Sequence, residues 1–275
     1  MHQLLCNGEL LPAASFRLPL PNRGLAFGDG FFETLIFVDG RLRFADDHFE
    51  RMRQATAALY LVLPVVLSSA EALENTLDQL ASANSLPAAR LRLQLWRGGG
   101  GRYTPQSSEA EWLATAEPFE PDETPIDRAH FALDTYSTYS PLSFCKGPQA
   151  WLYVRAAHER QLRGLDEIIL CDAQGHVAEA GAAAIFWVKG GVLFTPSLES
   201  GCVAGVRRAQ VLRAARTAGI ECHEGLFLPA SLLCADAAFT ANVAALRSIR
   251  RVGDGTFKLS LHQTATGALI AGQGS

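Results

Sequence analysis

The chain has 275 residues, of which 48% are hydrophobic and 19% charged, so it can form one large or two medium packed domains and is neither disordered nor fibrous. Its net charge of −4 argues against a general nucleic-acid binder, which would usually carry a basic excess. No apolar run reaches the roughly 18 residues that a membrane helix needs, because Pro64 interrupts the longest one.

The cysteines bear on the compartment. The six cysteines include no Cys-x-x-Cys pair, which favours buried or free thiols in a reducing cytosol and argues against a metal site. Residues 1–3 show no basic segment followed by an apolar one, so we expect no signal peptide and a cytoplasmic protein.

The first part of the chain is expected to alternate strands with two helices. Asn7-Gly8 and Asp39-Gly40 are typical of two-residue hairpin turns between short apolar runs. Residues 89–96 alternate arginine or glutamine with leucine, which predicts a half-buried strand. The other predicted elements are strands at 4–6, 9–11, 32–38, 41–44 and 111–115, a helix from an N-cap at Asp46 to about Leu59, and a helix over 69–83.

A proline-rich, acidic segment at 118–128 is the best candidate for a linker between a smaller domain at 1–117 and a larger one at 129–275. The second domain is expected to hold strands at 130–136 and 167–171, a helix between Pro148 and Gly164, a hairpin of 184–188 and 192–194, and a helix over 206–217. Helices and strands mix without a regular βαβ rhythm, so we expect a two-domain α+β protein.

Lysines are rare in this chain. The 24 basic residues include only three lysines, Lys146, Lys189 and Lys258, and only a lysine can form a Schiff base. Lys146 follows an apolar or neutral segment, where desolvation would favour the neutral, nucleophilic amine. An exposed loop lysine is the commoner explanation, and it fits Lys189 and Lys258, which lie at turns.

Other candidate residues are ambiguous when taken singly. Glu179, flanked by alanines, is either a solvent-facing turn residue or a buried carboxylate that needs a cationic partner. Arg51 could bind phosphate or pair with Asp47 or Glu50, and His48 is more typical of a capping or core histidine than of a catalyst. The helix beginning after Gly205 offers an anion site or an ordinary start.

A glycine-rich segment lies between two arginines. Arg97 and Arg102 flank four consecutive glycines, and no Gly-Lys-Ser/Thr follows, so this is not a Walker-type phosphate loop. The two arginines could hold a carboxylate, or they could pair with nearby acids such as Glu109 and Glu111.

Six segments follow one another along the chain: 22–34 (NRGLAFGDGFFET), His48-x-x-Arg51, Lys146, 175–179 (GHVAE), 201–208 (GCVAGVRR) and 239–242 (FTAN). In order and spacing they resemble the fold-type IV, class IV aminotransferase-like enzymes that use pyridoxal 5'-phosphate, over nearly the whole chain. The family includes branched-chain and D-amino-acid aminotransferases and 4-amino-4-deoxychorismate lyase.

The resemblance implies a role for each matching residue. Lys146 would be the catalytic residue that carries the cofactor as a Schiff base, and Glu179 would face the pyridine nitrogen. Arg51, the backbone amides of Val206 and Arg207, and Asn242 would hold the phosphate. Arg102, with Arg97 and Phe32, would contact a small carboxylate substrate. The resemblance also implies a homodimer with active sites near its interface, and no metal.

The sequence departs from the family pattern in three places. Gly147-Pro148-Gln149 replaces the Thr or Ser, Leu and Asn that many relatives have after the lysine. The alanine-rich residues 180–184 supply no hydroxyl after Glu179, and Arg207 stands where relatives commonly have threonine.

Within the family, the glycine-rich loop and the segments 28–34 and 183–187 favour 4-amino-4-deoxychorismate lyase, which releases pyruvate and p-aminobenzoate, a folate precursor. An amino-acid aminotransferase, for branched-chain or D-amino acids, uses the same residue types and is the alternative. A more remote alternative, suggested by the alanines after Glu179, is a non-catalytic protein that kept the fold.

Overall fold

The computed structural model describes residues 2–147, 150–264 and 266–267. By its contacts the chain divides into two compact units: unit 1 comprises Met1–Glu120 and Cys145–Pro148, and unit 2 comprises Pro121–Phe144 and Gln149–Ser275. Helices and strands occur in both, and the predicted α+β class is confirmed. The domain boundaries predicted from the sequence stay a prediction. None of the helices in the described part has the length and apolar character needed to cross a bilayer.

Unit 1 is built on a six-stranded antiparallel sheet with the strand order β2-β1-β6-β5-β3-β4. The strands are β1 (Gln3–Cys6), β2 (Glu9–Pro12), β3 (Gly30–Val38), β4 (Arg41–Leu42), β5 (Ala88–Arg97) and β6 (Ala110–Pro118). Both predicted hairpin turns are confirmed, since Asn7-Gly8 and Asp39-Gly40 have the positive φ angles that such turns require.

Unit 1 also contains helices α1 (Arg23–Phe27), α2 (Ala45–Ala58) and α3 (Ala70–Ala83), and a 3-10 turn at Val65–Leu67. The predicted N-cap of α2 at Asp46 is wrong, because Phe44 occupies that position with φ 58° and Asp46 lies in the first turn. An acidic side chain in the first turn still stabilises the helix through its favourable interaction with the positive end of the helix dipole. Ser69 caps α3 by accepting from Ala72 N at 3.0 Å.

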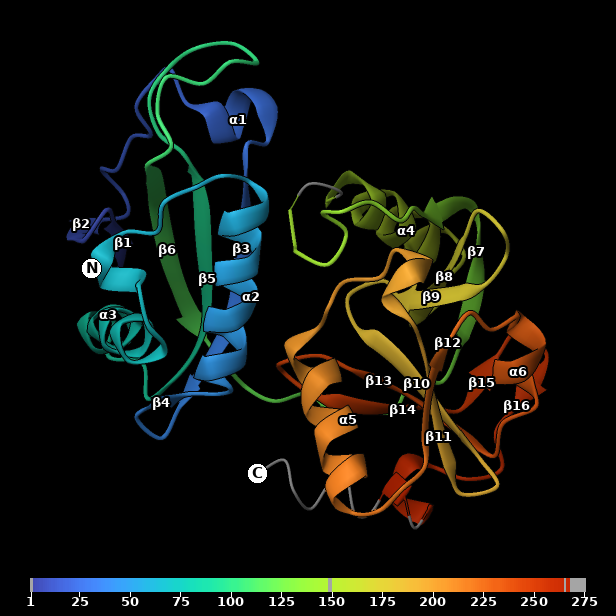
Figure 1. Cartoon of the computed structure of the whole chain (residues 1–275). Helices are drawn as coiled ribbons and strands as arrows, with labels where there is room; N and C mark the ends of the chain where they lie inside the picture. Colours follow the sequence, from blue (N-terminus) through green and yellow to red (C-terminus); the bar gives the residue numbers. More distant parts are fainter. Residues whose placement is uncertain (1, 148–149, 265, 268–275) are drawn as a thin grey trace. The chain divides into compact units, whose positions relative to one another are not determined.

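The two faces of the unit 1 sheet differ in character. Helices α2 and α3 lie along it (Figure 1), and the buried leucines of β5, at 91, 93 and 95, alternate with the exposed Arg90, Arg92 and Gln94. Strand alternation therefore puts the leucines in the core and the polar side chains on the opposite face, which we call the open face.

Unit 2 contains two five-stranded sheets, with the orders β12-β11-β10-β13-β14 and β16-β15-β7-β8-β9. The first comprises β12 (Cys222–Gly225), β11 (Val192–Pro196), β10 (Ala184–Lys189), β13 (Ala237–Ala241) and β14 (Leu246–Ile249). The second comprises β16 (Gly255–Thr256), β15 (Arg251–Val252), β7 (Ala129–Ser137), β8 (Glu167–Asp172) and β9 (Val177–Ala180). The helices of unit 2 are α4 (Ala150–Leu162), α5 (Val206–Thr217) and α6 (Pro229–Leu233), with 3-10 turns at Leu198–Ser200 and Leu261–Gln263.

The core of unit 2 lies between and around these sheets. Ile169 and Val177 of one sheet pack with Ile185 and Trp187 of the other. Helix α4 packs Leu152 and Ala156 against β8, while α5 packs on β10 and β13 (Figure 1). This arrangement fixes β9, α4 and the start of α5, which carry Glu179, Tyr153, Val206 and Arg207.

Candidate active site

The segment that carries Lys146 is held against the start of β3. Phe32 N donates to Lys146 O at 2.9 Å, so the lysine joins the edge of the open face of unit 1. The next residue, Gly147, has φ 137°, and a Cβ there would lie 2.9 Å from Phe31 Cα. A glycine is therefore required at this position by both conformation and space. Lys189 and Lys258 are exposed at the ends of strands and turns.

Arg51 and His48 lie one turn apart on α2 and reach the same buried carboxylate, Glu33 of β3. Arg51 Nε donates to Glu33 Oε1 at 2.8 Å and Arg51 Nη2 to Oε2 at 2.5 Å, while His48 Nδ1 lies 2.8 Å from Oε2. Burial alone would raise the pKa of Glu33, but the charges and hydrogen bonds of Arg51 and His48 lower it to about 2. Glu33, which the sequence did not suggest as a partner, is thus a buried partner of Arg51.

His48 is a neutral member of this cluster. Burial lowers its pKa, and the charges of Arg51 and Lys146 lower it further. Because ionised Glu33 accepts from Nδ1, the neutral ring carries its lone pair on Nε2. Within the described residues, His48 Nε2 is buried and has no hydrogen-bond partner. The charges of Lys146 and Arg51 thus both lower the pKa of the buried His48.

In unit 2, Glu179 lies on β9 and is 4% exposed. The hydroxyl of Tyr153, on α4, donates to Glu179 Oε1 at 2.7 Å, and Val203 N donates to Oε2 at 3.3 Å. Glu179 is thus a buried carboxylate with hydrogen-bond donors from α4 and from the segment before α5, and not an exposed turn residue.

The start of α5 carries Val206 and Arg207. Its N-cap is Gly205, and no described side chain caps it. The amides of a first helical turn and the positive end of the helix dipole suit an anion. Arg208 is directed elsewhere, since its Nη2 donates to Pro196 O at 2.7 Å and to Glu224 Oε2 at 2.8 Å.

Asn242 follows β13 and shapes a turn. Its Oδ1 accepts from Ala244 N at 3.0 Å and Ala245 N at 3.1 Å, and its Nδ2 donates to Ala182 O at 3.4 Å. The side chain therefore holds the turn together, and the phosphate contact expected for it stays a prediction.

The glycine-rich loop is anchored through two buried arginines. Asp29 accepts from Arg23 Nε at 2.7 Å and from Arg97 Nε at 3.0 Å, and the two guanidinium groups lower the pKa of Asp29 despite its partial burial. Arg97 also donates to the carbonyls of Leu59 and Tyr60. A direct substrate contact by Arg97 would break these bonds, so its position fits support of the loop.

Arg23 fixes the loop backbone itself. Its Nη1 donates to the carbonyl oxygens of Gly100, Gly101 and Arg102 at 3.3, 3.0 and 2.8 Å. The side chain of Arg102 is exposed. The structure thus separates the two loop arginines, with Arg97 buried and paired and Arg102 on the surface.

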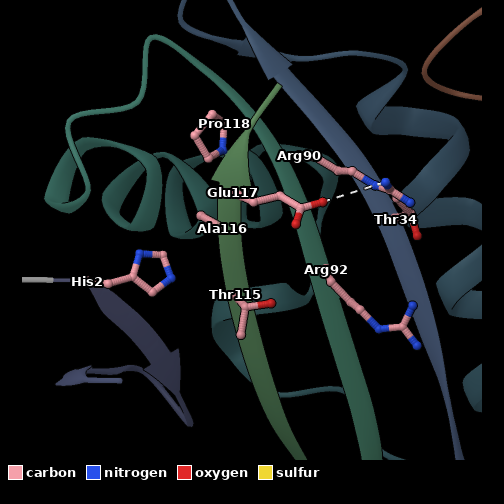
Figure 2. Close-up of a pocket in the computed structure, with 8 residues that line it drawn as sticks. All are labelled: His2, Thr34, Arg90, Arg92, Thr115, Ala116, Glu117 and Pro118. Carbon is pink, nitrogen blue, oxygen red and sulfur yellow. Dashed lines mark ion pairs between the residues drawn. The ribbon is translucent and has the colours of Figure 1, made fainter. Parts of the chain in front are cut away.

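A cavity of about 490 Å³ lies on the open face of unit 1 (Figure 2). Six of the eight residues that line it have polar or charged side chains; the lining consists of His2, Thr34, Arg90, Arg92, Thr115, Ala116, Glu117 and Pro118. Arg90 pairs with Glu117 at 3.6 Å, whereas Arg92 has no acidic partner in the described part of the chain.

Arg92 connects this cavity to the lysine segment. Its guanidinium carbon lies 3.7 Å from the centre of the Phe32 ring, and Phe32 N is bonded to Lys146 O. Burial lowers the pKa of Arg92, as does the charge of Arg90 to a smaller extent, so an anion would be favourable here. Lys146, Phe32 and Arg92 form a continuous series of contacts within unit 1.

Three functional candidates were not singled out from the sequence: Glu33, Arg92 and Tyr153. The alternation of residues 89–96 could have placed Arg92 on a polar sheet face, and Glu33 lies inside a recognised segment. Tyr153 had no sequence signal, because only the packing of α4 on β8 brings it to Glu179.

Comparisons with known proteins give a consistent result. A model of the family described as amino-transferase class IV matches residues 30–252. The chain is 26% identical to a putative branched-chain-amino-acid aminotransferase of Methanocaldococcus jannaschii, covering 88% of this chain and 85% of that protein. It is 27% identical to an aminodeoxychorismate lyase of Bacillus subtilis, covering 86% of this chain and 81% of that protein.

A solved structure shows the same fold. The PLP-form of branched-chain amino acid aminotransferase from Thermobaculum terrenum superimposes with a TM-score of 0.84 at 18% identity, covering 99% of this chain and 92% of that chain. At this identity the likeness establishes the fold alone.

Proposed function

Since the chain belongs to the amino-transferase class IV family and is a pyridoxal-phosphate-dependent enzyme, we propose that it is a 4-amino-4-deoxychorismate lyase. The observation that carries the proposal is the cavity on the open face that Arg90 and Arg92 line, where Arg92 has no acidic partner among the described residues. A branched-chain substrate would need an apolar pocket for its side chain. A substrate with two carboxylates suits an arginine-lined one.

The residues present fit the cofactor. Arg51 is a buried guanidinium, and the start of α5 presents backbone amides with no capping side chain in the described residues, so both suit a phosphate dianion. Glu179 is a buried carboxylate of the kind that pairs with a pyridine nitrogen. We assign phosphate binding to Arg51, Val206, Arg207 and Asn242, and the nitrogen to Glu179.

In the proposed lyase reaction, each of these residues has a separate role. When bound, pyridoxal phosphate supplies an electron sink for the electron pair left when a proton leaves the substrate carbon next to the amine. Lys146, displaced by the substrate amine, takes that proton at Nζ. The carbon–oxygen bond to the enolpyruvyl group then breaks and the ring becomes aromatic, while the leaving enolpyruvate takes up a proton, equal in number to the one held by Lys146, and becomes pyruvate. Arg92 and Arg102 hold the substrate carboxylates, and Phe32 packs beside them.

The test is a product assay. Purified protein is given 4-amino-4-deoxychorismate in one reaction, and amino acids with 2-oxoglutarate or pyruvate in others. The proposal expects p-aminobenzoate and pyruvate in equal amounts from the first reaction only, and none with the Lys146→Ala variant. New amino acids without p-aminobenzoate would overturn it.

An amino-acid aminotransferase is the second candidate. It is favoured by the likeness to the Methanocaldococcus jannaschii aminotransferase, whose 26% identity is nearly the same as that of the lyase from Bacillus subtilis. The same product assay distinguishes the two candidates, since the cofactor and Lys146 serve both.

We also infer a cytoplasmic homodimer. All six cysteines are in the thiol form, as is usual in a reducing compartment. Exposed apolar side chains gather on unit 1 around α1 and the glycine-rich loop, where Leu25, Phe27 and Tyr103 are 71%, 47% and 93% exposed. The rings of Phe27 and Tyr103 contact each other at a tilt of 50° with centres 5.9 Å apart, so the exposed apolar side chains are contiguous, which supports a protein partner at this surface.

A further inference from the structure

Glu179 is a carboxylate in a place that disfavours charge. It is 4% exposed, and its strand neighbour across β8 is the fully buried Leu170. A buried carboxyl group tends to take up a proton unless donors stabilise its ionised form. A protonated Glu179 could not pair as an anion with a protonated pyridine nitrogen, so its ionisation matters for the role proposed above.

Tyr153 supplies a strong donor. Its hydroxyl lies 2.7 Å from Glu179 Oε1, a length typical of a charge-assisted O–H···O⁻ bond, whereas the Val203 N–H lies 3.3 Å from Oε2. Burial raises the pKa of Tyr153 far above its ordinary value, and the charge of Glu179 raises it further. Tyr153 therefore keeps its proton and remains a donor at every physiological pH.

The position of Tyr153 is fixed by the fold. Its neighbour Leu152 and Ala156 pack against Ile168 and Leu170 of β8, and the Tyr153 ring packs against the same cluster. Residues 180–184 supply no hydroxyl beside Glu179, so the donor comes from a different element, α4.

We propose that Tyr153 is a positioning residue that holds Glu179 ionised and oriented toward the pyridine nitrogen of the cofactor. The inference rests on the proposed role of Glu179, but it is independent of whether the enzyme is a lyase or an aminotransferase. The hydrogen bond to Oε1 fixes the plane of the carboxylate and stabilises its charge. Loss of the hydroxyl should therefore weaken the electron sink and leave substrate binding in unit 1 intact.

Cys202 and Arg208 lie near this cluster but do not replace the Tyr153 hydroxyl. Cys202 lies within electrostatic reach, but burial raises the pKa of Cys202 to about 11, so the thiol is neutral. Arg208 acts on Cys202 and is bonded to Glu224. Tyr153 is thus the side chain whose hydroxyl contacts the Glu179 carboxylate directly.

The test compares Tyr153→Phe with a matched control, Tyr136→Phe. The control removes a hydroxyl that donates to Leu133 O at the surface of the same unit, 3.0 Å away. Infrared titration of the apoprotein, read as the difference from Glu179→Gln, follows proton uptake by Glu179. In Tyr153→Phe the midpoint should move up by about one pH unit, whereas Tyr136→Phe should match the wild type.

Kinetics of the loaded enzyme give the second measurement. With whichever substrate turns over, kcat of Tyr153→Phe should fall about tenfold or more while KM stays within about twofold. An unchanged Glu179 titration, or a fall only in thermal stability with normal titration and kcat, would overturn the inference. If the titration shifts but no p-aminobenzoate forms with the wild type, Tyr153 keeps its role and the lyase proposal fails.

Discussion

At the scale of single residues, Lys146 is distinguished from the other two lysines by its surroundings. It is half-buried and bonded through its carbonyl to β3, whereas Lys189 and Lys258 are exposed. Lys146→Ala should abolish turnover and the covalent attachment of cofactor, because no other amine occupies that place. Borohydride reduction followed by peptide mapping measures the attachment.

Lys189→Ala is the matched control and should behave as the wild type. A reduced adduct on Lys189 or Lys258 in the wild-type protein would refute the assignment to Lys146.

Glu33 stabilises unit 1 through its charge. Lowering of its pKa from 4.5 to about 2 corresponds to about 3 kcal/mol of stability at neutral pH. This contribution is complete above the pKa of the unfolded state and is lost as the pH falls toward the folded value. Glu33→Gln should therefore lower the free energy of unfolding by about 3 kcal/mol at pH 7, with a smaller difference near pH 3.

Chemical denaturation at the two pH values measures this effect. Glu50→Gln, which breaks an exposed pair with Arg53, is the control and should change little. A pH-independent difference between wild type and Glu33→Gln would mean that shape, and not charge, is what Glu33 provides.

Motifs named candidate residues for the site, but they did not reveal the partners of those residues. The family segments identified Lys146, Arg51 and Glu179 as candidates. They did not show that Arg51 pairs with Glu33 or that Tyr153 bonds to Glu179, because these contacts join residues 18 and 26 positions apart through sheet packing. Side-chain pairing across elements is a property of tertiary structure, and local sequence carries no direct record of it.

At the scale of elements, sequence periodicity predicted where helices and strands occur better than where they begin. The alternation in β5 and the length of α5 were confirmed, since both depend on local patterns. Strand β9 was missed because Val177–Ala180 is fully buried and has no polar alternation. The start of α2 was misplaced because a left-handed Phe44, and not an acidic side chain, begins the helix.

The polar face of β5 gives a test of substrate binding. Arg92→Leu should raise KM about tenfold or more, because a charge-assisted bond to a substrate carboxylate is lost. The cofactor spectrum should stay that of the wild type. Steady-state kinetics with the substrate found in the product assay measure KM, and Arg92→Lys should restore part of it.

Arg90→Leu is the control on the same face, since Arg90 already pairs with Glu117. Arg102→Leu, made in parallel, should also raise KM if the exposed loop arginine holds the second carboxylate. An unchanged KM in both Arg92→Leu and Arg102→Leu would refute the proposal that these arginines of unit 1 bind the substrate carboxylates.

At the scale of the whole molecule, the exposed apolar side chains around α1 predict self-association. A patch that includes Leu25 and Tyr103 would be costly to leave in water on a monomer. Sedimentation velocity should show a dimer, and Leu25→Glu with Tyr103→Glu should shift it toward monomer by burying charge at the contact. A stable, fully active monomer of the wild type would contradict this prediction.

Residues 145–148 belong to unit 1 although they are distant from it in sequence, and this determines whether the chain can be divided into two independent fragments. Unit 1 is discontinuous in sequence, so a fragment ending at residue 120 lacks the strip of backbone that bonds to Phe32. Lys146 would remain on the other fragment. The fragments 1–120 and 121–275 are therefore not independent domains, because unit 1 is complete only when both are present. If the chain is divided between residues 120 and 121, we expect activity only when the two fragments are mixed and reassemble, so the activity itself measures reassembly.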